Sequence, residues 1–210
     1  MWNGSIHAIV GGVDPSDDTR HEAEQRTQAT NVRYQAALST ESRLPDGCAD
    51  IVTCSQYLHW MEPEGTFAEV ARILRDGGVF AAYDCDWPPV IQWEAEAAYI
   101  DLMRRAAAID CERGFTSGLQ EWRKDQHLER MRASGHFRYV REITLHHMET
   151  GSAERLVGLA MSQGQVASLL KRGLNETEIG LDRLREIAQR TVGEGPSSWY
   201  FSYRVRLGIK

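Results

Sequence analysis

The apolar residues in the first half of the chain fall into short runs that are separated by polar turns. Buried parallel strands have nearly continuous apolar stretches, so these runs predict strands. The predicted strands cover Ala8–Val13, Val32–Ala37, Ala49–Ser55 and Val79–Tyr83. Helices are predicted from Asp17 to about Gln28 and over Thr66–Leu74, where the glycines of Asp76–Gly78 would end the second helix. Strand, helix and strand with short joints predict a parallel crossover unit.

The second half of the chain has longer helical patterns and two further strand patterns. Helices are predicted for Glu94–Glu112, Leu119–Ser134, Ser152–Gly173 with an interruption near Gly164, and Asn175–Thr191. Asn175 and Glu178 have the spacing of a helix-starting cap. Tyr139–Leu145 is a predicted strand. Trp199–Ile209 alternates apolar with polar or small residues, which is the clearest period-two signal in the chain and predicts a strand with one buried face.

The order of these patterns predicts an α/β fold, and a chain of 210 residues fits a single domain over residues 1–210. The strands and their connecting helices would form the core, and the remaining helices would form a cap over the strand ends. The core would comprise residues 6–86, 139–147 and 197–209, and the cap residues 90–134 and 152–191.

Composition narrows the classes of function. A net charge of −6 with no basic block argues against a nucleic-acid partner. No apolar run approaches the roughly 20 residues of a membrane span, and no secretory signal is visible. The four cysteines lack the paired spacing of a zinc site. We therefore expect a cytoplasmic protein with reduced thiols, without a metal or a membrane partner.

Polar residues collect just after the ends of two predicted strands. Ser55, Gln56 and His59 follow one strand, and Asp84 and Asp86 follow the next. In open α/β sheets, ligands bind at the carboxyl ends of the strands. This edge is therefore the candidate binding site.

Three segments carry a resemblance to a known family. They are Leu44–Pro45, Asp50–Trp60 with the pattern D-I-V-T-C-S-Q-x-x-H-W, and Glu69–Phe80 with the pattern E-V-x-R-I-L-x-x-G-G-x-F. Together they resemble class I S-adenosylmethionine-dependent methyltransferases, particularly the small-molecule enzymes such as trans-aconitate methyltransferases. The resemblance implies a Rossmann-like, mostly parallel sheet with an antiparallel C-terminal strand at an edge.

The resemblance also implies residues that bind the cofactor. Asp14 would accept hydrogen bonds from the ribose hydroxyls, although a carboxylate before Pro15 could instead cap a helix. The loop after the second predicted strand would hold the adenine, or be a plain polar loop, and the loop after the third would lie beside the methionine part. The implied residues are Asp14, Pro15, Ser16, Ser39, Thr40, Glu41, Ser55 and Gln56.

His59 is the candidate catalytic residue, because an imidazole can act as a general base near neutral pH. The alternative is a buried histidine beneath the cap, since methyl transfer can proceed mainly by positioning. The predicted substrate pocket comprises His59, Trp60, Asp84, Asp86 and Trp87. His146, His147 and Glu149 have metal-ligand chemistry, but adjacent residues of a strand point to opposite faces, so we expect no shared ion.

One motif of the family is missing. The glycine-rich turn that follows the family's first strand has no counterpart, because Gly11 and Gly12 lie inside a predicted strand. That first strand sits mid-sheet in the family, so its absence would leave backbone groups of two strands unpaired. The second strand could pair with the fourth, another chain could donate a strand in a homodimer, or the natural protein could carry upstream residues. We favour a chain truncated at its N-terminus.

The sequence therefore predicts methyl transfer from S-adenosylmethionine to a small-molecule acceptor, impaired if the chain is truncated. The first alternative is a non-catalytic or vestigial protein that keeps the fold and acts by binding a partner. The second is a nicotinamide-dependent oxidoreductase, which also places a carboxylate after its second strand. The chain shows no Tyr-Lys pair suited to hydride transfer, which argues against the second alternative.

Overall fold

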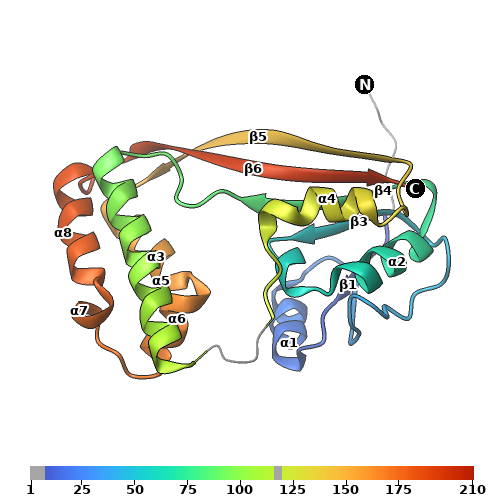
Figure 1. The fold of residues 1–210 in the computed structure, drawn as a ribbon, viewed down its shortest axis with the longest axis horizontal. Helices are drawn as coiled ribbons and strands as arrows, with labels where there is room; N and C mark the ends of the chain where they lie inside the picture. The colour runs from blue at the N-terminus through green and yellow to red at the C-terminus, as the bar shows by residue number, and fades with distance from the viewer. Residues whose placement is uncertain (1–7, 116–119) are drawn as a thin grey trace. The chain divides into compact units, whose positions relative to one another are not determined.

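The computed structural model describes residues 8–115 and 120–210 (Figure 1). Within these residues the strands are β1 Val10–Val13, β2 Val32–Gln35, β3 Ala49–Ser55, β4 Leu74–Cys85, β5 Tyr139–Gly151 and β6 Ser197–Ile209. The α-helices are α1 Asp17–Arg26, α2 Pro63–Ile73, α3 Trp93–Arg113, α4 His127–Ala133, α5 Ala153–Ser162, α6 Gly164–Lys171, α7 Glu176–Ile179 and α8 Leu181–Thr191. Short 3-10 helices occur at η1 Leu58–Trp60 and η2 Lys124–Gln126. The predicted α/β class is confirmed.

The chain divides into two compact units. The units are Met1–Tyr83 with Glu121–Ile143 and Val205–Lys210, and Asp84–Gln120 with Thr144–Arg204. We call them unit 1 and unit 2. Each has a hydrophobic core of its own, and the single-domain organisation expected from the sequence stays a prediction.

The strands form two sheets. β1 and β2 make a parallel pair, and the other sheet has the order β3-β4-β6-β5, in which β3 and β4 are parallel. The N–H of Lys210 donates to the Gly78 carbonyl at 3.1 Å, and the N–H of Asp86 donates to the Ser202 carbonyl at 2.8 Å. Residue numbers therefore run in opposite directions along β4 and β6, which makes β6 antiparallel as predicted.

The predicted edge position of the C-terminal strand is wrong. β6 lies between β4 and β5, and β5 is the edge strand. A strand that is paired on both sides loses more surface than an edge strand does. Trp199 and Phe201 of β6 are buried accordingly, whereas most of β5 is exposed.

The core of unit 1 is built around α2 and β4. α2 begins where the Glu62 carboxylate accepts hydrogen bonds from the N–H groups of Glu64 and Gly65, at 2.9 and 2.6 Å. Its apolar face packs Phe67 edge-on against Phe80 of β4, with ring centroids 6.2 Å apart. The rest of this cluster is apolar too and comprises Cys54, Leu58, Val70, Leu74, Ala82, Met131 and Phe137.

Unit 2 buries apolar side chains between its helices and one face of its strands. Helices α3, α5, α6 and α8 lie on the same side of β5 and β6 (Figure 1). Trp199 and Phe201 point into this core, and Tyr200 between them is exposed. Gly151 gives the Trp199 ring its space, since a side-chain carbon at Gly151 would lie 2.2 Å from the ring. The alternating pattern of the C-terminal strand is thus explained by this core.

Several predicted helix ends are corrected. Asp76–Gly78 does not end α2: the helix stops at Ile73, Leu74 adopts an extended backbone, and the glycines belong to β4. The helix predicted from Leu119 to Ser134 is short, because α4 begins only at His127, and Leu119 itself lies outside the described residues. The last predicted helix starts as expected at Asn175 but is broken by Gly180, whose φ of 99° is incompatible with a continuous helix.

The segment over residues 8–36 has a different character. It contains β1, α1 and β2, yet none of its residues is buried. Ile9, Val10 and Val13 are exposed apolar side chains.

Across the whole described part of the chain, none of the helices combines the length and apolar character needed to span a membrane.

Candidate functional site

Asp14 lies directly after β1, where the chain turns into α1. Its N–H donates to the Gln35 carbonyl at 3.2 Å, which fixes it beside the end of β2. Its carboxylate oxygen Oδ1 accepts the N–H of Ser16 at 2.8 Å. The side chain of Ser16, in turn, caps α1 by accepting the Thr19 N–H at 3.3 Å. Asp14 therefore stabilises the turn between β1 and α1, whereas Ser16 is the residue that caps α1.

The polar loop after β2 is a tight turn that is attached to α2. The N–H of Glu41 donates to the Leu38 carbonyl at 3.1 Å. The hydroxyls of Ser39 and Thr66 are hydrogen-bonded at 2.9 Å. The turn also lies close to the backbone of α2 at Gly65. A side-chain carbon added at Gly65 would lie 2.9 Å from the Thr40 methyl group. The three residues predicted for adenine binding are thus held against the first turn of α2.

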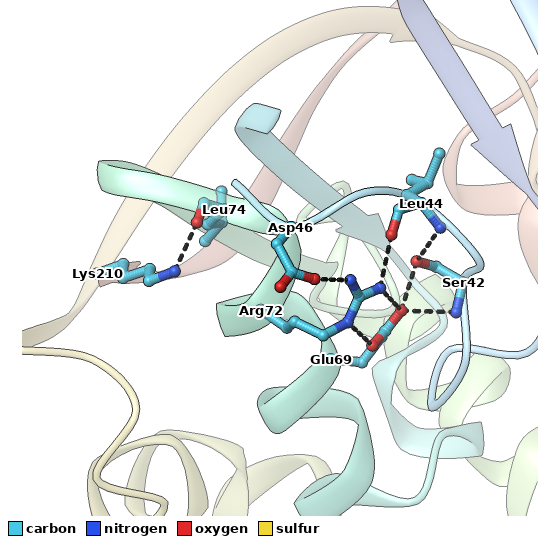
Figure 2. Close-up of polar contacts among 7 residues, drawn as sticks. All are labelled: Ser42, Leu44, Asp46, Glu69, Arg72, Leu74 and Lys210. Carbon is cyan, nitrogen blue, oxygen red and sulfur yellow. Dashed lines mark hydrogen bonds and ion pairs between the residues drawn. The ribbon is translucent and has the colours of Figure 1, made fainter. Parts of the chain in front are cut away.

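Next along the chain, a buried carboxylate fixes the loop that enters β3 (Figure 2). Glu69 of α2 accepts the N–H and the hydroxyl of Ser42, at 2.7 and 2.5 Å. It also accepts two hydrogen bonds from Arg72, at 2.8 and 2.7 Å. Arg72 extends the network by donating to the Leu44 carbonyl at 2.8 Å and by pairing with Asp46.

These contacts change the ionisation of the pair. The hydrogen bonds from Arg72, together with those from Ser42, lower the pKa of Glu69 to about 2 even though burial acts in the opposite direction. The same interaction raises the pKa of Arg72. Both groups are therefore charged across the physiological range, and their role is to hold the loop. This network was not predicted from the sequence, in which its signal was a Glu and an Arg three residues apart on one helix.

Ser55 and Gln56 end β3 at the candidate edge. Gln56 has a φ of 53°, the left-handed region that residues other than glycine rarely adopt. Its N–H donates to the Tyr83 carbonyl at 2.9 Å, which joins the carboxyl ends of β3 and β4. Strained backbone of this kind is often found at binding sites, so the left-handed Gln56 makes the loop after β3 a candidate binding loop.

His59 and Trp60 lie in η1, immediately after this loop. His59 is buried, and its carbonyl accepts the Trp122 N–H at 2.7 Å. The rings of His59 and Trp60 are tilted against each other with centroids 5.1 Å apart, and Trp60 is 43% exposed. Burial of His59 matches the alternative that the sequence left open, while its catalytic role stays a prediction.

The other predicted pocket residues belong to unit 2. Asp84 is buried. Arg204 bonds to both carboxylate oxygens of Asp86, at 3.0 and 3.1 Å. Trp87 packs edge-on against Phe201 with centroids 6.1 Å apart. Asp86 and Trp87 thus have structural contacts within their own unit, and the joint substrate pocket stays a prediction.

The histidines of β5 also have separate neighbours. The Nδ1 atom of His146 lies 3.1 Å from the Ser202 hydroxyl, and the Nε2 atom of His147 lies 3.4 Å from Glu149. Over residues 8–115 and 120–210, no group of three or more His, Cys, Asp or Glu side chains is arranged to hold a metal ion.

The strand order and the crossover units define a Rossmann-like fold, and solved methyltransferase structures share it. A candidate type II methyltransferase from Anaeromyxobacter dehalogenans has a TM-score of 0.66 at 20% identity, over 95% of this chain and 80% of that one. The YcgJ protein from Bacillus subtilis has a TM-score of 0.51 at 18% identity, over 95% of this chain and 81% of that one. The fold is thus a Rossmann-like fold that is also seen in a solved candidate methyltransferase.

Sequence comparison also finds methyltransferases, over the N-terminal part of the chain. Residues 2–82 match the methyltransferase domain family. A candidate methyltransferase of Dictyostelium discoideum is 32% identical over 69 residues, which cover 33% of this chain and 25% of that protein. The chain thus spans about a quarter of the length of this curated relative. The family match over residues 2–82 includes Asp14, the loops after β2 and β3, and α2.

Proposed function

We propose that this chain binds S-adenosylmethionine at the loops that follow β1, β2 and β3 and transfers its methyl group to a small-molecule acceptor. The observation that carries the proposal is the hydrogen bonding between the loops after β1 and β2 within unit 1. Gln35 accepts the N–H of Asp14 and donates its amide to the Ser42 carbonyl at 2.5 Å. Ser39 connects the same loop to Thr66 of α2. Hydrogen bonds therefore link the first two of the proposed cofactor loops to each other.

Each loop has a role in the proposal. Asp14 uses one carboxylate oxygen for the Ser16 N–H. A carboxylate has about four acceptor positions, so others stay available to ribose hydroxyls. Ser39, Thr40 and Glu41 would bound the adenine. Ser55 and the left-handed Gln56 would lie beside the methionine part, where backbone atoms make much of the contact.

The bound cofactor supplies an electrophilic methyl group on a sulfonium. The protein then has to orient an acceptor in line with that group and exclude water. His59 is the candidate proton acceptor, and Trp60 beside it is proposed to contact the acceptor.

The unpaired strand edges support a further part of the proposal. Within the described residues, β1 pairs only with β2, and β3 pairs only with β4. A ribbon of two four-residue strands is marginally stable in water. We therefore propose that the β1 end of the site is weakly ordered and that cofactor affinity and activity are reduced.

A non-catalytic role is the alternative, and one observation favours it. Asp14 Oδ1 and the Ser39 hydroxyl, two groups proposed to bind cofactor, already bond to protein groups. A protein that keeps this fold without cofactor would act by binding a partner.

Calorimetric titration with S-adenosylhomocysteine separates the two functions. Wild-type protein should release heat on binding, and Asp14→Ala should bind at least about ten-fold more weakly, since hydrogen bonds to a charged group contribute roughly 1.5–3 kcal/mol. Asp18→Ala, an exposed carboxylate in the first turn of α1, is the matched control and should bind like wild type. Absence of heat with wild type would support the non-catalytic role, and equal affinity of Asp14→Ala would remove the ribose assignment.

A further inference from the structure

The two edges of β3 can be told apart by its hydrogen bonds. β3 and β4 are parallel, with Ser55 opposite Tyr83. In a parallel strand, both backbone groups of one residue point to the same neighbour, and the side alternates along the strand. Because the N–H of Gln56 donates to the Tyr83 carbonyl at 2.9 Å, the even-numbered residues of β3 face β4. The backbone groups of Ile51, Thr53 and Ser55 therefore point to the opposite edge.

This opposite edge is open. Among the residues that the structure describes, no strand pairs with it. Ile51, Thr53 and Ser55 are all exposed, and Ile51 retains 65% of its accessible surface. The register irregularity of β3 lies before Ile51, so the segment 51–55 is regular.

Natural edge strands are usually protected from pairing by charges, prolines or bulges. Residues 51–55 contain no charge and no proline. The nearest charge, Asp50, is paired with Arg75. An exposed, regular, uncharged edge with apolar Ile51 is a typical template for an added strand.

We propose that a second copy of this chain occupies the edge, with β3 of one copy antiparallel to β3 of the other around a two-fold axis at Thr53. Thr53 then faces Thr53 of the partner, and Ile51 faces Ser55 in both directions. Since these are the three residues whose backbone groups point outward, all three pairs exchange hydrogen bonds. None of the three pairs brings like charges together, so the edge is self-complementary.

The size of this contact sets its strength. A ladder of five residues per chain buries less than the roughly 1,200–2,000 Å² of a stable interface. The dimer should therefore be weak and form at high protein concentration. The proposal goes beyond the methyltransferase function and does not depend on it.

Sedimentation velocity on the full chain over about 5 to 300 µM provides the first test. Wild type should show a dimer that dissociates on dilution. Thr53→Lys should raise the dissociation constant at least ten-fold, because two lysines would face each other across the axis. Thr53→Val keeps the size and strand preference and should dimerise like wild type. Monomer at every concentration, or equal dimerisation of the lysine variant with an unchanged circular dichroism spectrum, would overturn the proposal.

A cross-link tests the register. Residues facing each other in a hydrogen-bonded antiparallel pair have Cα atoms about 5.5 Å apart, within disulfide range. Thr53→Cys should therefore form a disulfide with its own counterpart under mild oxidation, located by mass spectrometry. Ser55→Cys is the control, because its counterpart lies away from it and such a link should be rare. Equal cross-linking of the two variants, or none in either, would contradict the two-fold axis at Thr53.

Discussion

Glu69 accepts four hydrogen bonds from Ser42 and Arg72 within unit 1. It joins α2 to the loop that leads from β2 to β3, and that loop follows the turn proposed for adenine (Figure 2). The carboxylate is nearly buried, while Arg72 keeps 36% of its side-chain surface. A buried carboxylate with four hydrogen bonds stabilises the fold mainly because leaving its partners unpaired would be costly.

Glu69→Gln should therefore destabilise the protein by about 2 kcal/mol at pH 7. The full pKa shift corresponds to more, at about 1.4 kcal/mol per unit, and we reduce it because solvent screens the exposed part of Arg72. The folded pKa of Glu69 lies below its unfolded value of 4.5. Its contribution is present above pH 4.5 and is lost as the pH falls towards 2.

Urea unfolding at pH 7 and at pH 3 measures this effect. The difference in unfolding free energy between wild type and Glu69→Gln should shrink at pH 3. Glu24→Gln, an exposed carboxylate of α1, should change stability by less than about 0.5 kcal/mol at both pH values. A difference for Glu69→Gln that stays constant with pH would show that its charge does not act as described.

At this scale the sequence predicted positions but not contacts. Asp14, Ser39 and Gln56 could be selected because they follow predicted strands, where ligands bind in open sheets. The hydrogen bonds of this region could not be predicted from the sequence. Ser39 bonds to Thr66 and Ser42 bonds to Glu69, and each partner is 27 residues away along the chain. Such contacts depend on how helix and strand pack.

At the scale of elements, the alternating C-terminal segment was predicted correctly as a strand, whereas its place in the sheet was not. Alternation reports which residues are buried on the faces of a strand. It does not report which strands lie on either side, so an edge position could not be distinguished from an inner one. The interruption of the last helix was likewise invisible in the helical pattern, because it depends on the left-handed backbone of Gly180.

Gly151 gives a prediction for the junction of β5 and α5. Gly151→Ala should destabilise the protein by about 1–3 kcal/mol, because the added carbon would overlap the buried Trp199 ring. Thermal unfolding followed by tryptophan fluorescence measures the change. Gly195→Ala is the matched control in the loop before β6, where nothing lies within 4 Å of the added carbon. Equal stability of the two variants would mean that the packing of Trp199 is looser than described.

At the scale of the whole molecule, the fold class was predictable because it depends on the order of strands and helices along the chain. The division into two units was not, since it depends on which residues share a core. Unit 1 also contains the segment 8–36, which has strand and helix structure but no buried residue. This segment therefore adds little buried surface to the core of unit 1.

Hydrogen–deuterium exchange with and without S-adenosylhomocysteine tests the central claim most directly, because it reports where the cofactor product binds. We expect slower exchange at the amides of Asp14, Ser16, residues 39–42 and residues 55–57, with little change in helices α5 and α8. Slower exchange confined to other segments, or no change at saturating S-adenosylhomocysteine, would contradict the proposed cofactor site.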